Sequence, residues 1–490
     1  MEHQLGPTYL GIDLGTSGLR CLLASQEGEV LDSADHSYSV DSISSGYNEQ
    51  DPKDWIDALK TAIGKLKKNN KAAIGRLNAI GIAGHMHGAT LLDKNGKILH
   101  PCILWNDTRS YKQASALDHD TNLRDITGNI VFPGFTSPKL LWIRDNKPEL
   151  FAKVAKVLLP ASYLGFYLTG DFFMDMSDAA GTSWLDVGNR CWSDYALNAS
   201  NMRSDQMPDL FEGSQVASSV SKFIADELGI PSGVSVVAGA GDNAAAACGV
   251  GIMQEGQGFV SLGTSGVLLT ARDAYTPLAQ SAVHTFCHAI PKTWYQMGVI
   301  LSATDSLNWL SNITGKSPIE LSEGLTHKIN GPSSEKFYPY LSGERTPLND
   351  AHIRGGFVGL STNSNQTKLT QAVMEGVAFA LRDCMEALEN AGPCPDQLLA
   401  IGGGSRSRFW LETIATTLNT AIAYPIDGEY GAAMGAARLA ILGKTSEPIK
   451  NILSQPNIAE TIKPRPDLTD LYCEAFARYK NAPFHLKSIQ

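Results

Sequence analysis

The chain opens with short apolar runs separated by turn residues. Apolar runs at 9–14 and 19–24 flank a Gly-Thr-Ser-Gly turn, and a second turn at 26–29 leads to another apolar start at Val30. Short apolar runs bounded by such turns predict the strands of a β-meander.

A helix is expected next, because Asp51 and Pro52 form an N-cap and first-turn pair. Apolar residues then recur at helical spacing, at Trp55, Leu59, Ile63 and Leu66. Beyond this helix the pattern predicts strands over 77–83 and 103–105, a hairpin across 94–97 and a helix beginning near Ser137.

The second half of the chain repeats this opening. The pentapeptide Leu-Gly-Thr-Ser-Gly occurs at 14–18 and again at 262–266, each time directly after an apolar run. The pattern around and beyond the second copy predicts strands over 258–262, 267–270, 294–300 and 398–401, a turn at 402–405, and helices around 307–310, over 369–391 and through 409–414. The Ala/Gly-rich segment 431–442 can pack very closely on a sheet.

Length and repetition together predict two domains. At 490 residues the chain is too long for one ordinary core, and the two pentapeptides place one similar loop in each half. We therefore expect two α/β domains, 1–253 and 254–490, with the boundary near 251–257.

Composition narrows the class of protein. Hydrophobic residues make up 43% of the chain and charged residues 18%, as in a well-packed soluble protein. The formal net charge of −10, without a long basic run, argues against nucleic acid or an anionic membrane as partner. Scattered cysteines, and the lack of a signal sequence or spanning run, predict a cytoplasmic protein. The sequence leaves the oligomeric state open, a homodimer included.

The two pentapeptide loops are candidate phosphate-binding loops. A Gly-Thr-Ser-Gly turn exposes backbone N–H groups and adds hydroxyl donors, which are Thr16 and Ser17 in the first copy. The residue before the leucine is Asp13 in the first copy and Ser261 in the second. Asp13 is either a carboxylate satisfied by loop amides or a ligand of the Mg²⁺ that accompanies a nucleotide, and the adjacent turn favours the ligand.

Asp242 lies where an apolar strand over 234–238 gives way to an alanine run. At such a junction either Asp242 or Asn243 is expected to cap the helix. The competing role for Asp242 is a general base that takes the proton of an alcohol attacking a γ-phosphate, and a helix N-terminus would help to keep it ionised. The sequence leaves both roles open.

Two more loops carry polar residues at strand ends. His85 and His87 are interpreted as a buried structural pair, as zinc ligands with His100 and Cys102, or, for His87, as a hydrogen-bond partner of a polyhydroxylated ligand. The structural pair is favoured over zinc, because no further ligand lies nearby in sequence. Asn106 has the same polar character at another strand end, with an Asx turn as its alternative.

A third loop, Gly402 to Gly404, stands between a strand and a helix. It would let a nucleotide approach the backbone closely, although three glycines are also a common tight turn. The chain has neither a Walker loop nor a dinucleotide-binding fingerprint after its first strand.

Taken in order, these segments resemble the FGGY family of carbohydrate kinases over nearly the whole chain. The segments are 11–18, 84–88, 103–107, 175–181, 241–243, 261–265, 340–347 and 402–404. The resemblance implies two ribonuclease-H-like α/β domains of the actin/hexokinase/Hsp70 superfamily, with sugar and ATP meeting in an interdomain cleft. It implies ATP-dependent phosphorylation of D-xylulose to D-xylulose 5-phosphate, with ribulose or a related polyol or sugar acid as the alternative substrate. A sugar-independent actin-like ATPase and a sugar-sensing regulator are the alternatives of other classes.

The resemblance also implies roles for individual residues. Asp242 corresponds to the catalytic base of the family, and Asp13 to its aspartate associated with Mg²⁺. Sugar contacts are implied for Met86, His87, Asn106, Asp242 and Asn243. Contacts with ATP are implied for Thr16, Ser17, Gly263, Thr264, Asn308, Gly402, Gly403, Gly404 and Ser407.

One position departs from the family pattern. His85 stands where family members that act on xylulose usually have glutamine. A histidine cannot donate and accept from one plane as a primary amide does, and its ordinary pKa lies near neutrality. The sugar preference is therefore less well defined by the sequence than the kinase chemistry.

Overall fold

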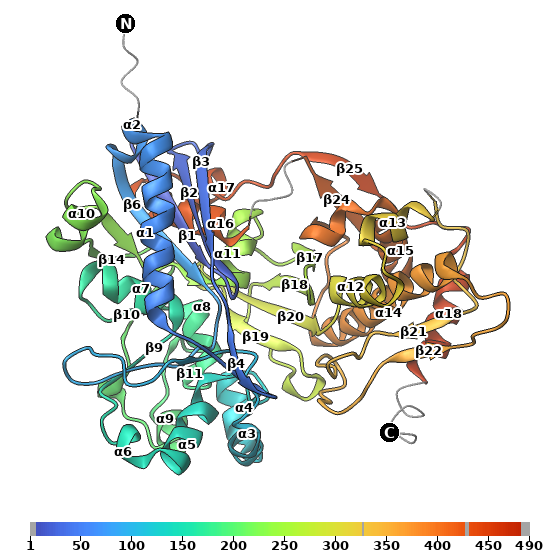
Figure 1. Cartoon of the computed structure of the whole chain (residues 1–490), viewed down its shortest axis with the longest axis horizontal. Coiled ribbons are helices and arrows are strands. Elements are labelled where there is room, and N and C mark those ends of the chain that lie inside the picture. The colour runs from blue at the N-terminus through green and yellow to red at the C-terminus, as the bar shows by residue number, and fades with distance from the viewer. Residues whose placement is uncertain (1–5, 326–327, 427–430, 482–490) are drawn as a thin grey trace, which may run out of the picture. The chain divides into compact units, whose positions relative to one another are not determined.

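The computed structural model describes residues 6–325, 328–426 and 431–481, which form two compact units (Figure 1). Unit 1 comprises Met1–Met253, Phe286–Trp294 and Tyr430–Gln455, and unit 2 comprises Gln254–Thr285, Tyr295–Glu429 and Pro456–Gln490. The sequence domains 1–253 and 254–490 remain a prediction, since neither unit is continuous along the chain.

The central sheet of unit 1 has the strand order β14-β15-β6-β1-β2-β3, with β16 also pairing with β6. Its strands are β1 (Thr8–Leu14), β2 (Gly18–Ser25), β3 (Val30–Ser37), β6 (Leu77–Gly84), β14 (Val216–Ser219), β15 (Ser235–Val237) and β16 (Ala240–Gly241). The strands β1, β2 and β3 are antiparallel neighbours, whereas β1, β6 and β15 run parallel. The predicted meander at the start of the chain is confirmed.

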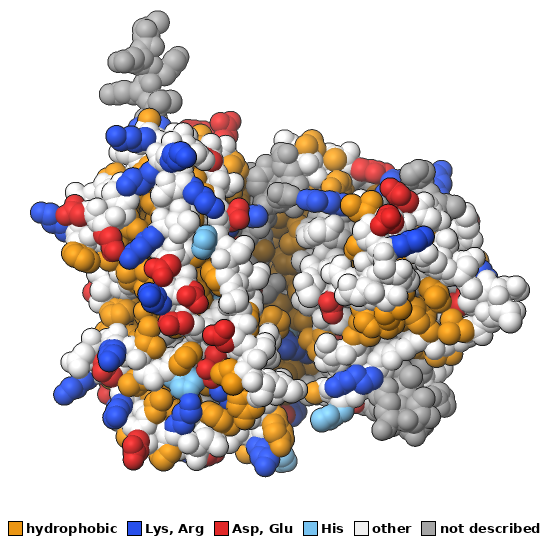
Figure 2. All heavy atoms as spheres, viewed as in Figure 1, with side chains coloured by type: hydrophobic (Ala, Val, Ile, Leu, Met, Phe, Trp, Pro, Cys, Tyr) orange, Lys and Arg blue, Asp and Glu red, His pale blue; other side chains and the backbone are white. Residues whose placement is uncertain are grey.

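Helix α1 (Pro52–Asn69) covers one face of this sheet (Figure 1). Asp51 caps it by accepting from the N–H of Lys53, and the predicted apolar face is buried. Acidic and basic side chains are interspersed on its outward face (Figure 2). In β1, Leu10 and Ile12 pack in the same core as Trp55 of α1. Because side chains alternate across a strand, the residue between them must face the other side of the sheet.

That other face is covered by helices α11 (Asp242–Gly249) and α16 (Ala432–Lys444). A Cβ at Gly11 of β1 would lie 1.8 Å from the carbonyl oxygen of Ala433, and a Cβ at Gly81 of β6 would lie 2.0 Å from that of Ala436. The backbones therefore touch, as the Ala/Gly-rich sequence of α16 predicts. This helix returns to unit 1 after the chain has formed most of unit 2.

Shorter elements complete unit 1. Its remaining helices are α2 (Lys71–Ile74), α3 (Tyr111–Asp118), α4 (Thr121–Thr127), α5 (Thr136–Asn146), α6 (Pro148–Phe151), α7 (Pro160–Thr169), α8 (Met176–Ala179), α9 (Asp194–Ala199), α10 (Lys222–Leu228) and α17 (Ile449–Ile452), with 3-10 turns η1 (Ala180–Thr182) and η2 (Ser204–Gln206). Its remaining strands are β4 (Asp41–Ser44), β5 (Tyr47–Gln50), β7 (Thr90–Leu92), β8 (Cys102–Ile103), β9 (Lys156–Leu158), β10 (Phe173–Asp175), β11 (Leu185–Asp186), β12 (Cys191–Trp192) and β13 (Asp209–Phe211). The strand predicted over 103–105 ends early, because Asp107 N–H bonds to the carbonyl of Leu104 and turns the chain.

Unit 2 repeats this strand arrangement. Its sheet has the order β19-β20-β18-β17-β23-β24-β25, formed by β17 (Gly258–Leu262), β18 (Gly266–Arg272), β19 (His284–Cys287), β20 (Trp294–Ile300), β23 (Gln397–Ile401), β24 (Ala421–Pro425) and β25 (Ile458–Ile462). As in unit 1, the first strand of the sheet pairs antiparallel with the second and parallel with a later strand, which is β6 in unit 1 and β23 in unit 2. The strands β1 and β17, which precede the two pentapeptide loops, thus occupy equivalent places.

The core of unit 2 lies between this sheet and its helices, which are α12 (Thr304–Thr314), α13 (Pro318–Glu323), α14 (Gln366–Ala391), α15 (Arg408–Leu418) and α18 (Thr469–Lys480). The 3-10 turns η3 (Ala279–Ser281) and η4 (Gly403–Arg406) and the strands β21 (Lys336–Tyr338) and β22 (Gly356–Val358) complete the unit. The long helix predicted over 369–391 is confirmed as α14.

Candidate active site

The candidate site of unit 1 lies where three parallel strands end side by side. Asp13, near the end of β1, is in register with Ala83 of β6, and Gly84 is in register with Gly241 of β16. In α/β proteins ligands bind at the carboxyl ends of parallel strands. The loop 85–88 and the first turn of α11 therefore begin next to Asp13.

Asp13 is a partly buried carboxylate with a second carboxylate nearby. Burial and the charge of Asp242 raise its pKa to about 7, whereas Arg20, its antiparallel neighbour on β2, lowers it. Two desolvated acidic groups are stable together only if a cation or a proton offsets their charge. The hard oxygen atoms of Asp13 suit Mg²⁺ that is also bound by phosphate oxygens. Among the described residues no group of three or more His, Cys, Asp or Glu side chains could hold a metal alone.

Asp242 is the first residue of α11 and is partly exposed. Gly241 occupies the N-cap position, so neither Asp242 nor Asn243 is the N-cap residue that the sequence suggested. Burial raises the pKa of Asp242 to about 6, while hydrogen bonds from the backbone and side-chain amides of Asn243 lower it. The start of a helix also favours the charged form. Asp242 is therefore mostly ionised at neutral pH and near water, as a general base must be.

Met86 and His87 follow β6 at the same edge of the sheet. Met86 packs against Gly241, where an added Cβ would lie 3.0 Å from its Cγ. His87 adopts a left-handed backbone with φ of 72°, which is unusual for a residue other than glycine. Its Nδ1 bonds to the carbonyl of Gly181 at 2.7 Å, and its ring stacks on Phe135 at 4.5 Å between centroids. The structure thus places Met86, one of the predicted sugar contacts, against the residue that precedes Asp242.

His85 points into the protein core. It is 2% exposed, and its ring packs edge-on against Trp55 at 5.7 Å. Burial and nearby Lys139 lower its pKa to about 3, so the ring is neutral at physiological pH. The expectation of a titrating histidine at this position, drawn from its ordinary pKa, is therefore wrong.

The segment 175–183 contacts both His87 and Gly241, the residue before Asp242, and its sequence suggested no role beyond the family resemblance of 175–181. Oδ1 of Asp175 accepts from the hydroxyl of Ser177 at 2.5 Å, and that hydroxyl accepts from the N–H of Gly241 at 3.0 Å. Within the described part of the chain, neither carboxylate oxygen of Asp178 has a hydrogen-bond partner. Burial and the charges of Asp175 and Asp242 raise the pKa of Asp178 well above its ordinary value, which favours its neutral form.

The first pentapeptide loop is held by hydrogen bonds from neighbouring residues. Thr16 accepts through its hydroxyl from Trp105 Nε1 at 2.9 Å and through its carbonyl from Gln50 at 2.6 Å. Ser17 is exposed. The sequence missed the contribution of Trp105, because its partner lies 89 residues away.

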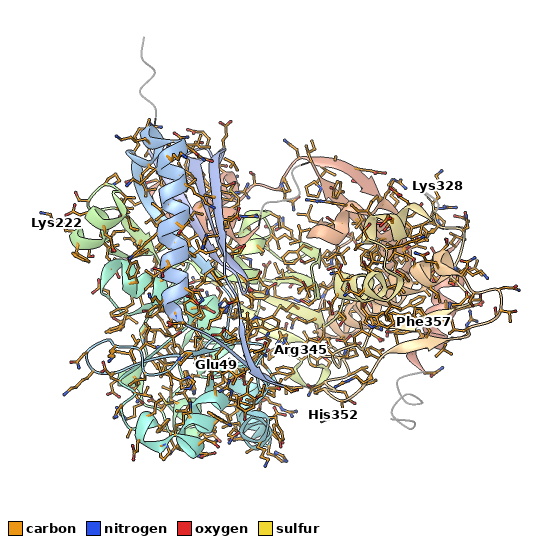
Figure 3. All side chains as sticks on the ribbon, viewed as in Figure 1. Glu49, Lys222, Lys328, Arg345, His352 and Phe357 are labelled. Atoms are coloured by element: carbon orange, nitrogen blue, oxygen red, sulfur yellow. The ribbon has the colours of Figure 1, made fainter. Side chains whose placement is uncertain are left out.

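Asn106, another predicted sugar contact, has an exposed side chain, and its backbone carbonyl accepts from the side-chain amide of Asn48. The next residue, Asp107, is fully buried and pairs with Arg109 at 2.7 Å. Arg109 also bonds at 2.6 Å to Glu49, which Figure 3 labels. This network fixes the loop, and a sugar contact by Asn106 remains a prediction.

Two of the predicted nucleotide residues of unit 2 contact the start of α12. The carbonyls of Gly263 and Thr264 accept from the N–H groups of Thr304 and Ala303. Gly402 has a φ of 85°, and its added Cβ would lie 2.8 Å from the carbonyl oxygen of Leu262. A side chain at this position would therefore both strain the left-handed backbone and collide with Leu262, so glycine is required.

The remaining predicted nucleotide residues differ in their surroundings. An added Cβ at Gly403 would meet nothing within 4 Å, whereas one at Gly404 would lie 2.8 Å from the Cβ of Leu262. Asn308 is exposed on α12. Ser407 is the N-cap residue of α15, where its hydroxyl accepts from the N–H of Trp410 at 3.3 Å. Their contacts with ATP remain predictions.

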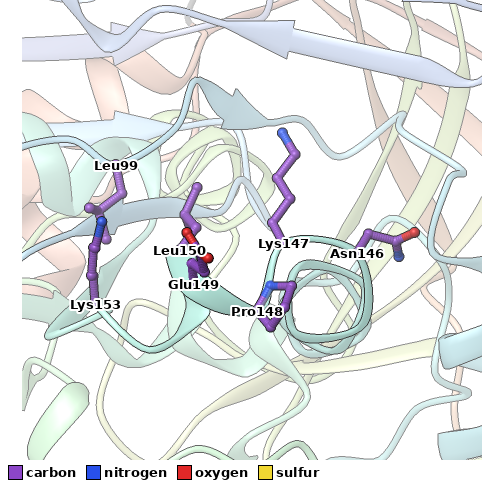
Figure 4. A pocket seen from close by; sticks show the side chains of 7 residues that line it. All are labelled: Leu99, Asn146, Lys147, Pro148, Glu149, Leu150 and Lys153. Atoms are coloured by element: carbon purple, nitrogen blue, oxygen red, sulfur yellow. The ribbon is translucent and has the colours of Figure 1, made fainter.

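One pocket of unit 1 contains none of the predicted residues. It has a volume of about 500 Å³ around α6, with Leu99 and Lys153 at one end and Asn146 at the other (Figure 4). No helix in the described ranges is long and apolar enough to cross a membrane.

Comparison with known proteins places the chain in a class. The N-terminal domain model of the FGGY family of carbohydrate kinases matches residues 8–249, and the C-terminal domain model matches residues 258–443. The chain belongs to the FGGY family of carbohydrate kinases.

Individual relatives are similar along nearly their whole length. A xylulose kinase of Escherichia coli strain K12 is 42% identical over 441 residues, which are 90% of this chain and 90% of that protein. The crystal structure of a xyloylose kinase from Brucella ovis is 50% identical, with a TM-score of 0.95, and the match covers 99% of this chain and 100% of that one. A glycerol kinase of Plasmodium falciparum with ADP, 20% identical, has the same fold with a TM-score of 0.88 over 98% of each chain. The predicted two-domain α/β kinase fold is confirmed.

Proposed function

We propose that this protein transfers the γ-phosphoryl group of ATP to the terminal hydroxyl of D-xylulose, giving D-xylulose 5-phosphate. The observation that carries the proposal is the position of Asp242, a partly exposed carboxylate at the start of α11 beside Met86 and Asp13. The similarity to xylulose kinases over nearly the whole chain supports this choice of sugar.

In this mechanism Asp242 accepts the proton of the sugar hydroxyl as its oxygen attacks the γ-phosphorus. The new O–P bond forms while the bond from phosphorus to the ADP oxygen breaks, and the proton remains on Asp242. His87 and Asn243 orient the sugar, and the backbone of Gly263, Thr264 and Gly403 binds the nucleotide. Alignment of the reacting groups supplies much of the catalysis in phosphoryl transfer.

The residues present fit Mg²⁺ bound with the nucleotide. Asp13 is desolvated beside a second carboxylate, and the described residues offer no complete protein-only site, as expected for a metal shared with phosphate oxygens. Bound there, Mg²⁺ would neutralise charge on the phosphates. Asp13 would hold that charge close to the transferring group.

An ADP-release assay with a panel of ketopentoses, polyols and sugar acids tests the substrate. D-xylulose should give the highest kcat/KM, and a higher value with ribulose, gluconate or glycerol would replace it as the substrate. ATP hydrolysis that is indifferent to every sugar would instead indicate an actin-like ATPase.

The variant Asp242→Asn tests the catalytic base, because it keeps the shape of the side chain and removes its basicity. Its kcat should fall by a factor on the order of 10² to 10⁴, while sugar binding measured by calorimetry is retained. Asp194→Asn is the matched control, since Asp194 is also the first residue of a helix in unit 1 and is exposed. Turnover of Asp242→Asn close to that of the wild type would contradict the assignment.

A further inference from the structure

Lys139 is buried in unit 1, and the hydrogen bond described for its amine goes to a backbone carbonyl, not to a carboxylate. It lies in the second turn of α5 and is 0% exposed. Burial lowers the pKa of its amine to about 7, partly offset by Cys102 and Asp107. A lysine in such a place is costly to the fold, because taking an ammonium group out of water is unfavourable.

The hydrogen bond that Lys139 makes is directed at the candidate site. Its Nζ donates to the carbonyl of His87 at 2.8 Å. The hydroxyl of Thr136, one turn earlier and also 0% exposed, donates to the same oxygen at 3.1 Å. Two buried donors from the first turns of one helix therefore converge on a single carbonyl.

That carbonyl belongs to His87, the residue of loop 85–88 with a left-handed backbone conformation. His87 holds a φ of 72°, a left-handed conformation that is strained for a residue with a Cβ and that persists only where surrounding contacts impose it. The ring is fixed in turn by the carbonyl of Gly181 and by stacking on Phe135, the N-cap residue of α5. The start of α5 thus contacts both the backbone and the ring of His87.

We propose that Lys139 and Thr136 are positioning residues for the sugar, which hold the backbone of His87 so that its imidazole meets a substrate hydroxyl. This inference rests on the proposed function, because it requires His87 to contact the sugar. Neither residue touches the reacting atoms. Their loss should therefore weaken sugar binding and leave nucleotide binding and the chemical step largely intact.

The variant Lys139→Met removes the donor and keeps an unbranched side chain. Its KM for the sugar should rise about tenfold, as expected for the loss of one buried hydrogen bond, while the KM for ATP stays within about twofold. Lys156→Met is the matched control, because Lys156 also donates to a backbone carbonyl of unit 1, that of Met207 at 2.9 Å. Its KM values should not change.

A pair of variants at Thr136 distinguishes a positioning role from a packing role. The pair also tests the inference if Lys139→Met does not fold. Thr136→Val keeps the volume and loses the hydroxyl, whereas Thr136→Ser keeps the hydroxyl and loses a methyl group. Positioning predicts a raised sugar KM for Thr136→Val and a nearly normal one for Thr136→Ser. The reverse order, or equal effects on the KM values for sugar and ATP, would overturn the inference.

The wild type is assayed first with the whole sugar panel, and the best substrate is used for all variants. If D-xylulose is not that substrate, the proposed function fails while the Lys139 test proceeds with the better sugar. If no sugar stimulates turnover, both proposals fail. An active wild type with an unchanged sugar KM in Lys139→Met and Thr136→Val overturns this inference alone.

Discussion

Asp242 has a pKa raised to about 6 by burial, and this value sets where the proposed base is active. A base must be deprotonated, so kcat/KM for the sugar should increase with pH and level off above about pH 7. The rate is measured from pH 5 to 8 at saturating Mg·ATP. A profile that is flat across this range would contradict the assignment of Asp242 as the base.

Asn243 allows a test of the direction in which a hydrogen bond shifts the pKa of Asp242. Its backbone and side-chain N–H groups donate to Oδ1 of Asp242 and stabilise the charged form, which lowers the pKa. Asn243→Ala removes only the side-chain donor, so the ascending limb of the pH profile should move to higher pH. Movement to lower pH would show that this hydrogen bond does not stabilise the carboxylate.

At the scale of elements, the one-turn helix α8 positions the first turn of α11. Ser177 is fully buried and links Asp175 to the N–H of Gly241, the residue before Asp242. Ser177→Ala would leave that N–H without its described partner, which costs about 1–3 kcal/mol and loosens the first turn of α11. We expect kcat to fall about tenfold with little change in the KM for ATP.

The matched control for this variant is Ser193→Ala, which removes the hydroxyl that accepts from Ala196 N–H at the start of α9. It should lower stability by about 1 kcal/mol and leave kcat unchanged. Steady-state kinetics and urea unfolding of both variants decide the matter. An equal loss of kcat in the two variants would mean that Ser177 acts only through stability.

The same elements show how far the sequence could predict the site. Asp13 lies near the end of an apolar strand, and His87 and Asp242 follow apolar strands, so local pattern and family resemblance point to them as candidates. The contacts of Lys139 and Ser177 could not be found in this way, because their partners lie 52 and 64 residues away along the chain. Local spacing predicts which strands and helices form, but a buried hydrogen bond between distant segments depends on how those elements pack.

At the scale of the whole molecule, unit 1 depends on a segment that follows most of unit 2 in the chain. Helix α16 packs on β1 and β6 through Gly11 and Gly81, and on α11 through its own Gly435. The strands that carry Asp13 and lead to His87, and the helix that begins with Asp242, thus share one supporting helix. The predicted division into domains 1–253 and 254–490 does not reveal that α16 packs in unit 1.

The substitution Gly435→Ala tests that dependence against Gly64→Ala, the same change in α1. A Cβ at Gly435 would lie 1.7 Å from the carbonyl oxygen of Ala245 in α11, so the two helices must separate. We expect a loss of about 1–3 kcal/mol in unfolding free energy, as for other overpacked cores. Gly64 is exposed with nothing within 4 Å of an added Cβ, and its replacement should stabilise the helix by about 0.5–1 kcal/mol. Because α11 begins with Asp242, Gly435→Ala should also lower kcat under conditions where the protein remains folded.

A folded Gly435→Ala variant with wild-type stability and kcat would show that α16 does not support the position of Asp242.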